Sequence, residues 1–60
     1  MATSRARMMQ AARRLERSND GLAAIARDVG YNAEFAFNRA FHRELGMPPG
    51  EYRKRHARAG

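Results

Sequence analysis

The 60-residue sequence has no cysteine, no tryptophan and only two prolines, and these absences exclude several kinds of protein. Without cysteine, neither a disulfide nor a thiolate metal site supports the small core of so short a chain. The two histidines, His42 and His56, have no carboxylate at ligand spacing, so no metal site is expected. No apolar run approaches the ~20 residues of a transmembrane helix, and the N-terminus lacks the apolar stretch of a signal peptide. We expect one soluble domain in a reducing cytoplasm, with no cofactor and no metal.

Catalytic motifs are also absent from the sequence. It contains no glycine-rich phosphate loop, no nucleophile elbow and no pair of acids at a plausible pocket. A chain of this length is too short to enclose a substrate cavity of ~300–1,000 Å³. We therefore expect a binding protein and not an enzyme.

Acidic residues are scarce, because six oppose twelve basic residues and leave a net charge of +6. Eleven of the twelve are arginine, whose planar fork suits phosphate and guanine. This balance favours a polyanionic partner, above all nucleic acid. Charge alone leaves two other interpretations open: a solvated surface on which arginine replaces lysine, and a basic helix lying on a membrane. The membrane is disfavoured because the apolar stripes are short and are expected to pack on one another.

The central stretch, residues 21–46, has the pattern of two helices joined by a tight turn. Apolar residues recur at helical spacing in both halves, with Leu22, Ile25, Ala26 and Val29 in the first and Phe37, Phe41 and Leu45 in the second. Gly30 lies between them, where a positive φ lets the chain reverse sharply. Two short helices with so tight a turn cross steeply, which predicts a helix-turn-helix.

The whole chain is predicted to be all-α, a small homeodomain-like bundle of about four short helices that contains the helix-turn-helix. The expected helices cover residues 4–17, 22–29, 33–45 and 49–55 of a single domain, residues 1–60. Gly46 is expected to end the third helix, and Pro49 suits the first position of the fourth. The expected core consists of Met9, Ala12, Leu15, Leu22, Ile25, Ala26, Val29, Phe37, Phe41, Leu45 and Tyr52.

The outer face of the predicted third helix is basic. Opposite its apolar stripe, at 100° per residue, lie Phe35, Arg39, His42 and Arg43, flanked by Ala36 and Asn38. Such a face offers an arginine to guanine, an asparagine to adenine and an apolar ring to a thymine methyl. Glu34 and Glu44 are expected nearer the buried side. The second helix of a helix-turn-helix enters the major groove, so this face predicts DNA reading. An ordinary amphipathic helix with a solvated basic face is the alternative.

Residues 30–53 resemble the signature of the AraC/XylS family of transcriptional regulators, and they read GYNAEFAFNRAFHRELGMPPGEYR. The positions in register are Gly30, Tyr31, Phe37, Arg39, Phe41, Gly46, Pro49, Tyr52 and Arg53, with Ile25, Ala26, Ala12 and Leu15 upstream. The resemblance covers about residues 5–55. Ala33 departs from the family's usual capping serine and Glu16 from its common leucine. We expect Asn32 to cap the third helix instead.

The resemblance implies the second, C-terminal helix-turn-helix unit of such a regulator, in which two units joined by a long helix read adjacent major-groove segments. The family's base-contacting positions fall on Glu34, Phe35, Asn38 and Arg39. Phosphate contacts, which position a protein without reading sequence, are expected from Arg27, Arg43 and Arg53. The expected partners are double-stranded DNA, a second helix-turn-helix unit in cis or by dimerisation, and RNA polymerase. The expected location is the bacterial cytoplasm, at the nucleoid.

A function of another class stays open beside DNA reading. In it the basic face binds an acidic protein partner, or the chain is a truncated remnant with only weak, non-specific affinity for DNA. Binding to DNA in the presence of mixed competitor DNA separates the two interpretations.

Overall fold

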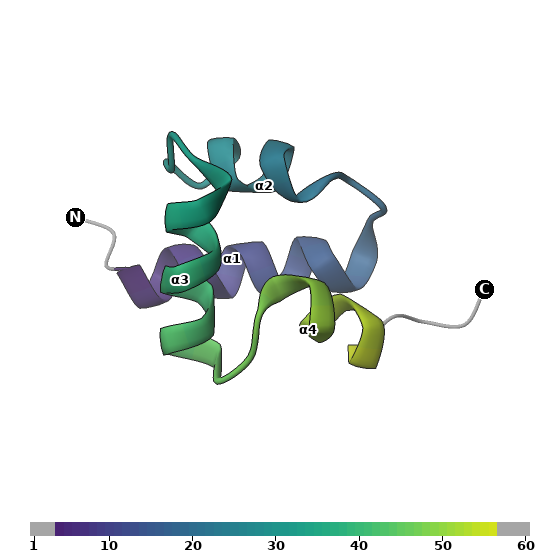
Figure 1. Ribbon diagram of the computed structural model, residues 1–60. Coiled ribbons are helices and arrows are strands. Elements are labelled where there is room, and N and C mark those ends of the chain that lie inside the picture. Colours follow the sequence, from purple (N-terminus) through teal and green to yellow (C-terminus); the bar gives the residue numbers. More distant parts are fainter. Residues whose placement is uncertain (1–3, 57–60) are drawn as a thin grey trace.

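The computed structural model describes residues 4–56, which form four helices (Figure 1). In chain order they are α1 (Ser4–Arg17), α2 (Leu22–Asp28), α3 (Glu34–Leu45) and α4 (Pro49–His56). No strand occurs within this range, so the predicted all-α fold is confirmed. The helix bounds differ from the expected ones by single residues. α2 ends one residue earlier, α3 begins one residue later and α4 ends one residue later.

Helix α1 is the platform on which the other three helices pack. It contacts α2, α3 and α4, while α3 also contacts both α2 and α4. Figure 1 shows α3 crossing α1 steeply. In the same view α2 lies above α1, and α4 lies beside the C-terminal half of α1. One side of α3 is therefore enclosed by the rest of the domain, and its opposite side faces outward.

The core lies where α1, α2 and α3 meet, and apolar side chains alone fill it. The buried hydrophobic residues are Met8, Ala11, Ala12, Leu15, Ile25, Ala26, Val29, Phe37, Ala40 and Phe41. Pro49 is fully buried as well, and Leu22, Tyr31, Leu45 and Tyr52 pack partly buried against the cluster. Among the residues whose burial is described, no polar or charged residue is buried.

The core position in the first helix belongs to Met8, and its assignment to Met9 was wrong. Met8 is fully buried, whereas Met9 is 45% exposed. Met8 lies on the same face as Ala12 and Leu15, four and seven residues on, and Met9 points about 100° away from that face. The two methionines are equally apolar, so only the register of the helix distinguishes them.

A row of aromatic rings connects the turn, α3 and α4. Tyr31 meets Phe37 edge to face with ring centroids 6.0 Å apart, and Phe37 meets Phe41 at 5.8 Å. Phe41 meets Tyr52 of α4 edge to face at 5.4 Å. These separations and tilts are the ones aromatic pairs prefer. Tyr52, which was predicted in the core, thus packs partly buried against it.

The turn between α2 and α3 is closed by a Schellman motif centred on Gly30. The Tyr31 N–H donates to the Ala26 carbonyl at 2.9 Å, and the Gly30 N–H donates to the Arg27 carbonyl at 3.0 Å. This paired pattern satisfies the last carbonyls of a helix when the intervening residue is left-handed. Gly30 has φ +98°, as the sequence predicted. The turn thus sets the angle at which α3 leaves α2.

Replacing Gly30 by valine is expected to destabilise the domain by more than ~1 kcal/mol, because a β-branched residue is strained at positive φ. A Cβ at this position also lies 3.3 Å from the Arg7 Nη1 atom, so Arg7 has to move. Urea denaturation measures the change. Gly50→Ala is the matched control, because Gly50 lies in α4 with open space around its Cβ position. An unchanged denaturation midpoint for Gly30→Val contradicts the strained turn.

The two ends of α3 are capped differently, without a side-chain hydrogen bond at the N-terminus and with a left-handed glycine at the C-terminus. Ala33 is the N-cap and provides no side-chain hydrogen bond, so the expected cap by Asn32 is wrong. Asn32 lies one residue outside the cap position. Glu34 places an acid in the first turn, where the helix dipole favours it. At the other end Gly46 is left-handed, with φ +86°, and its N–H donates to the His42 carbonyl at 2.9 Å. The predicted end of the helix at Gly46 is confirmed.

Candidate nucleic-acid interface

The outward side of α3 carries the residues that the helical pattern placed there. Exposed on it are Phe35, Ala36, Arg39, His42 and Arg43, while the opposite side contributes Phe37, Ala40 and Phe41 to the core. Asn38 is half-buried at the flank, as expected. Glu34 is exposed, so its predicted place nearer the buried side was wrong; Glu44 is half-buried. The outer face therefore has one acid at its N-terminal end and basic residues along the rest.

Within residues 4–56, the two arginines of this face make no close ion pair. Arg39 lies over the ring of Phe35, with its Cζ atom 5.9 Å from the ring centroid. Arg43 is 70% exposed, and its Nε atom lies 3.8 Å from a Glu44 carboxylate oxygen. An ion pair this long and this exposed contributes little to stability. Both guanidinium groups are available to a partner outside the domain.

Arg27 lies in the last turn of α2 and is exposed. It precedes the turn that leads into α3. No hydrogen bond or ion pair of its side chain occurs within residues 4–56. Arg27 is thus a basic, accessible residue of α2, whereas Arg39 lies on α3.

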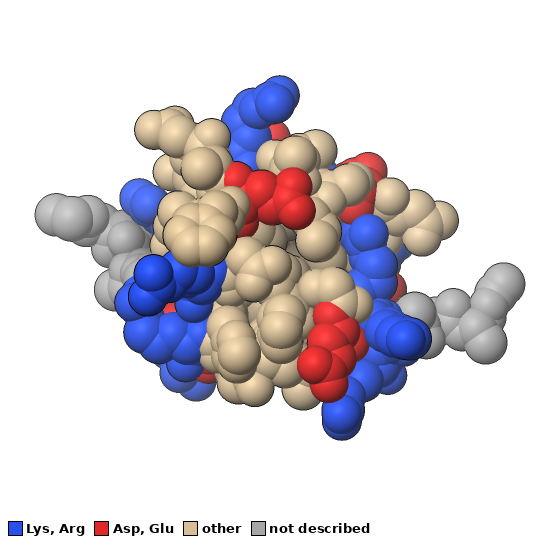
Figure 2. Space-filling model, in the orientation of Figure 1, with Lys and Arg blue, Asp and Glu red and all other residues tan. Residues whose placement is uncertain are grey.

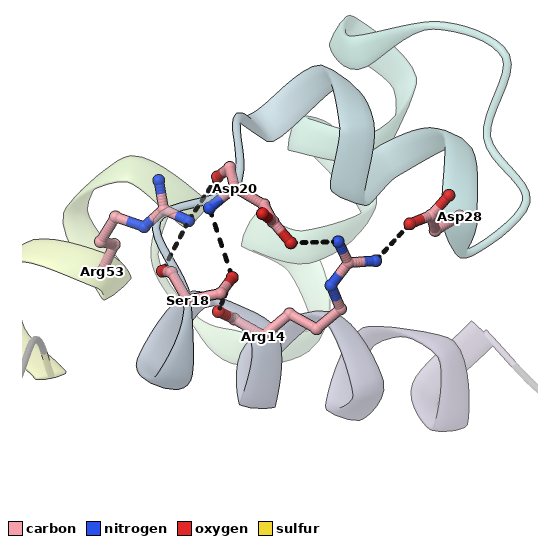
Figure 3. Close-up of polar contacts among 5 residues, drawn as sticks. All are labelled: Arg14, Ser18, Asp20, Asp28 and Arg53. Carbon is pink, nitrogen blue, oxygen red and sulfur yellow. Dashed lines mark hydrogen bonds and ion pairs between the residues drawn. The ribbon is translucent and has the colours of Figure 1, made fainter.

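Arg53 is engaged inside the domain (Figure 3). Its Nη2 atom donates to the carbonyl oxygens of Ser18 and Asp20, at 3.3 and 2.6 Å. Its Nε atom is buried without a hydrogen-bond partner in the described residues. The Arg53 guanidinium group thus joins α4 to the loop between α1 and α2, and its expected phosphate contact stays a prediction.

Arg14 joins the same loop to α2 (Figure 3). Its guanidinium group donates to the carboxylates of Asp20 and Asp28, one on each side. The hydrogen bond from Arg14 lowers the pKa of Asp20 below its ordinary value, and the bonds to both carboxylates raise the pKa of Arg14. Two of the chain's six acids are thereby neutralised locally. Sequence reasoning missed this cluster, because residues 14 and 28 have no local pattern that pairs them.

Glu16 accepts a hydrogen bond from the Tyr52 hydroxyl, which connects α1 to α4. This bond, together with partial burial, raises the pKa of Tyr52 to about 12. The His56 ring stacks on Tyr52 with centroids 4.0 Å apart. Glu16 is the position at which the sequence departs from the family's common leucine. The structure explains the departure, since a carboxylate here has a hydroxyl partner on α4.

Charged side chains are unevenly distributed over the surface. Figure 2 shows lysine and arginine at both sides of the face that α3 crosses, with a broad uncharged area and two acidic groups between them. In the described part of the chain, no group of three or more His, Cys, Asp or Glu residues is placed to hold a metal ion. Within the same residues, no helix combines the length and apolar character needed to cross a membrane.

The known proteins to which this chain is similar are all described as transcription regulators. The family model described as a helix-turn-helix domain matches residues 2–55. A Streptomyces lividans protein named as an AraC-like transcription regulator is 55% identical over 51 residues, which are 85% of this chain and 17% of that protein. A Streptomyces antibioticus protein of the same description is 51% identical over equal shares. The RCS-specific HTH-type transcriptional activator RclR of Escherichia coli strain K12 is 45% identical over 49 residues, 82% of this chain and 17% of RclR.

The chain thus spans about a sixth of the length of these curated relatives. No solved structure is significantly similar to it.

Proposed function

This chain belongs to the AraC family of helix-turn-helix transcription regulators, and we propose that it binds DNA sequence-specifically in the control of transcription. The resemblance found in residues 30–53 is confirmed by the family match. The proposed domain is residues 1–60, with α2 and α3 as the helix-turn-helix. By family analogy it is the second, C-terminal unit of a two-unit reader.

One observation carries this proposal. The exposed side of α3 holds an arginine without an ion pair in the described residues, next to an exposed aromatic ring, while the buried side of the same helix anchors the core. A rigid helix with an outward guanidinium group meets the geometric requirement for reading base edges in the major groove. By contrast, a helix face that is only solvated typically carries charges of alternating sign that form ion pairs along the helix.

The proposed base contacts are Glu34, Phe35, Asn38 and Arg39. Arg39 suits the O6 and N7 acceptors of guanine, and Phe35 suits a thymine methyl. Asn38 is able to pair with adenine, and Glu34 is able to accept from cytosine N4. All four lie in the first half of α3, which is the part of a recognition helix that reaches the bases.

The proposed phosphate contacts are Arg27, Arg43 and Arg53, of which Arg27 and Arg43 are exposed. They neutralise backbone charge, so they raise affinity for any sequence and make binding sensitive to salt. Arg53 is half-buried and its Nη2 atom donates to the loop carbonyls of Ser18 and Asp20, which leaves its Nη1 atom for a phosphate contact.

The proposed partners follow from this role. They are double-stranded DNA, a second helix-turn-helix unit in cis or by dimerisation, and RNA polymerase bound beside the regulated site. The role is not enzymatic. A protein that acts on the bacterial genome works in the cytoplasm, at the nucleoid, and this is the proposed location.

Arg39→Ala is expected to cost ~1–3 kcal/mol of binding free energy on the preferred site and to relax discrimination at one base pair, because it removes a bidentate contact to a base. Arg43→Ala, one helical turn further on, is the matched control. It is expected to weaken all sequences alike and to reduce the salt slope by about one unit. Titrations of specific and random duplexes at several salt concentrations measure both effects. Equal losses on specific and random DNA in both variants make Arg39 a phosphate contact and refute its role as a reader.

A further inference from the structure

Phe35 and Arg39 form a contact pair on the outer face of α3. They lie four residues apart, so their side chains occupy adjacent turns of one helix face. The Arg39 Cζ atom lies 5.9 Å from the centroid of the Phe35 ring, within the range of a cation–π contact. Phe35 is nevertheless 72% exposed. The ring therefore touches the guanidinium group and still presents most of its apolar surface outward.

This ring is the only partner of the Arg39 guanidinium group within residues 4–56. A free arginine side chain has many rotamers, and ordering them opposes binding. A stacking contact made before DNA arrives reduces that opposing entropy. Arg43, on the same face, makes no cation–π contact in the described part of the chain and has only a long contact to Glu44. Arg39 is thus the pre-positioned arginine of the face.

The exposed apolar surface of the Phe35 ring is stabilised when it contacts an apolar group in the major groove. The thymine methyl is the apolar group that base pairs present in the major groove. About 6 Å of helix rise separates positions four residues apart, and the Arg39 Cζ atom lies 5.9 Å from the centroid of the Phe35 ring. Successive base pairs lie about 3.4 Å apart. Since the separation of the two groups is less than two such steps, the pair reaches neighbouring base pairs and not distant ones.

We propose that Phe35 and Arg39 read one two-base-pair step as a coupled unit, with Arg39 on a guanine and Phe35 on the methyl of a thymine in an adjacent base pair. The proposal rests on the proposed function and specifies the sequence element that it recognises. Phe35 has two roles in it: it contacts the methyl group, and it is a positioning residue for Arg39.

The test begins by selecting the preferred duplex of the full 60-residue chain from a random pool. Single thymines of that duplex are then replaced by uracil, which removes only the methyl group, and single guanines by 7-deazaguanine, which removes the N7 acceptor. One uracil next to the guanine of Arg39 is expected to weaken wild-type binding about fourfold, the effect of one buried methyl group. The 7-deazaguanine at that guanine is expected to weaken it about fivefold or more.

Three variants separate the two roles of Phe35. Phe35→Ala is expected to lose the uracil effect and to show a smaller 7-deazaguanine effect. Phe35→Leu keeps an apolar contact without a π face, so it is expected to keep the uracil effect and to lose part of the 7-deazaguanine effect. Arg43→Ala is the control and is expected to keep both. Because Phe35 is exposed, equal thermal midpoints of the variants exclude a folding defect.

The outcomes distinguish this proposal from the proposed function. If the pool yields no preferred sequence, DNA reading itself fails and the coupled reading fails with it. If a guanine depends on Arg39 but no neighbouring thymine methyl matters, or if Phe35→Ala responds to both modified bases as wild type does, the coupled reading alone is overturned. Loss of the uracil effect only at a thymine distant from that guanine overturns it as well.

Discussion

Replacing Phe41 by alanine is expected to abolish cooperative folding of the 60-residue chain. Phe41 is fully buried, and its ring lies 5.8 Å from Phe37 and 5.4 Å from Tyr52 of α4. A buried Phe→Ala change costs ~3–5 kcal/mol, through lost burial and the cavity that remains. The core of a domain this small rarely supplies more than ~3–5 kcal/mol in total. The substitution therefore removes about as much stability as the domain has.

Thermal unfolding followed by circular dichroism measures this effect. Phe35→Ala is the matched control, because it is the same substitution in the same helix at a residue that is 72% exposed. Exposed positions of this kind change stability by about 0.5 kcal/mol or less. Phe41→Leu is expected to retain a cooperative transition at a lower midpoint. A sharp transition of Phe41→Ala near the wild-type midpoint shows that Phe41 does not hold α3 and α4 together.

The sequence predicted the fold well where one helix face or one special residue decides the structure. Phe37 and Phe41 recur at helical spacing, so their place in the core follows from periodicity alone. Gly30 and Gly46 were predicted at helix ends, and both have positive φ. At such positions glycine avoids the steric conflict of a Cβ atom. Local chemistry was sufficient for these features.

The errors lie where a neighbouring element decides the outcome. Met8 and Met9 are both apolar and adjacent, and only contact with the other helices selects Met8. Ala40 was not expected in the core, because a small side chain gives a weak hydrophobic signal where helices approach closely. For Arg53 the sequence shows only the charge, from which a phosphate contact was predicted; that contact stays a prediction, but the hydrogen bonds of its side chain were missed. Its carbonyl partners on Ser18 and Asp20 lie more than thirty residues away and are not visible there.

For the candidate site, the sequence predicted which residues are exposed on α3 but not the contacts that their side chains make. The 100° rotation per residue puts Phe35, Arg39 and Arg43 on one side of α3, and all three are exposed. The contact between Phe35 and Arg39 depends on side-chain rotamers, which periodicity does not specify. The neutralisation of Asp20 and Asp28 by Arg14 depends on the packing of α1 beside α2. Helical geometry thus predicts which residues are exposed on α3. Side-chain contacts and the packing of the helices decide which charged groups are paired.

The isolated chain is expected to bind DNA weakly, and a second reading unit is expected to change this greatly. One twelve-residue recognition helix covers a few base pairs of a single major-groove segment. Much of the affinity of so basic a domain comes from phosphate neutralisation, which any sequence provides. At physiological salt we therefore expect a Kd near the non-specific range, ~10⁻⁴–10⁻⁶ M, with a small preference for one sequence that selection from a random pool at lower salt still detects.

Joining two copies of the chain tests the second half of this prediction. The N-terminal end of α1 lies at the edge of the domain, where an added segment leaves without crossing α4 (Figure 1). A tandem protein joined there is expected to bind a duplex with two preferred sites about one helical turn apart ~10²–10⁴-fold more tightly than the single chain. The gain needs no new contact within the domain, because the second binding event becomes intramolecular.

The matched control is the same duplex with about five base pairs added between the two sites, which rotates them onto opposite faces of the DNA. A short connection then prevents both recognition helices from entering their grooves, so the gain is expected to disappear. The measurement is a titration of single and tandem proteins on both duplexes at fixed salt. Nanomolar, sequence-selective binding by the single chain contradicts the prediction. In that case α3 and the arginines around it form a self-sufficient reader, and a second unit supplies regulation instead of affinity.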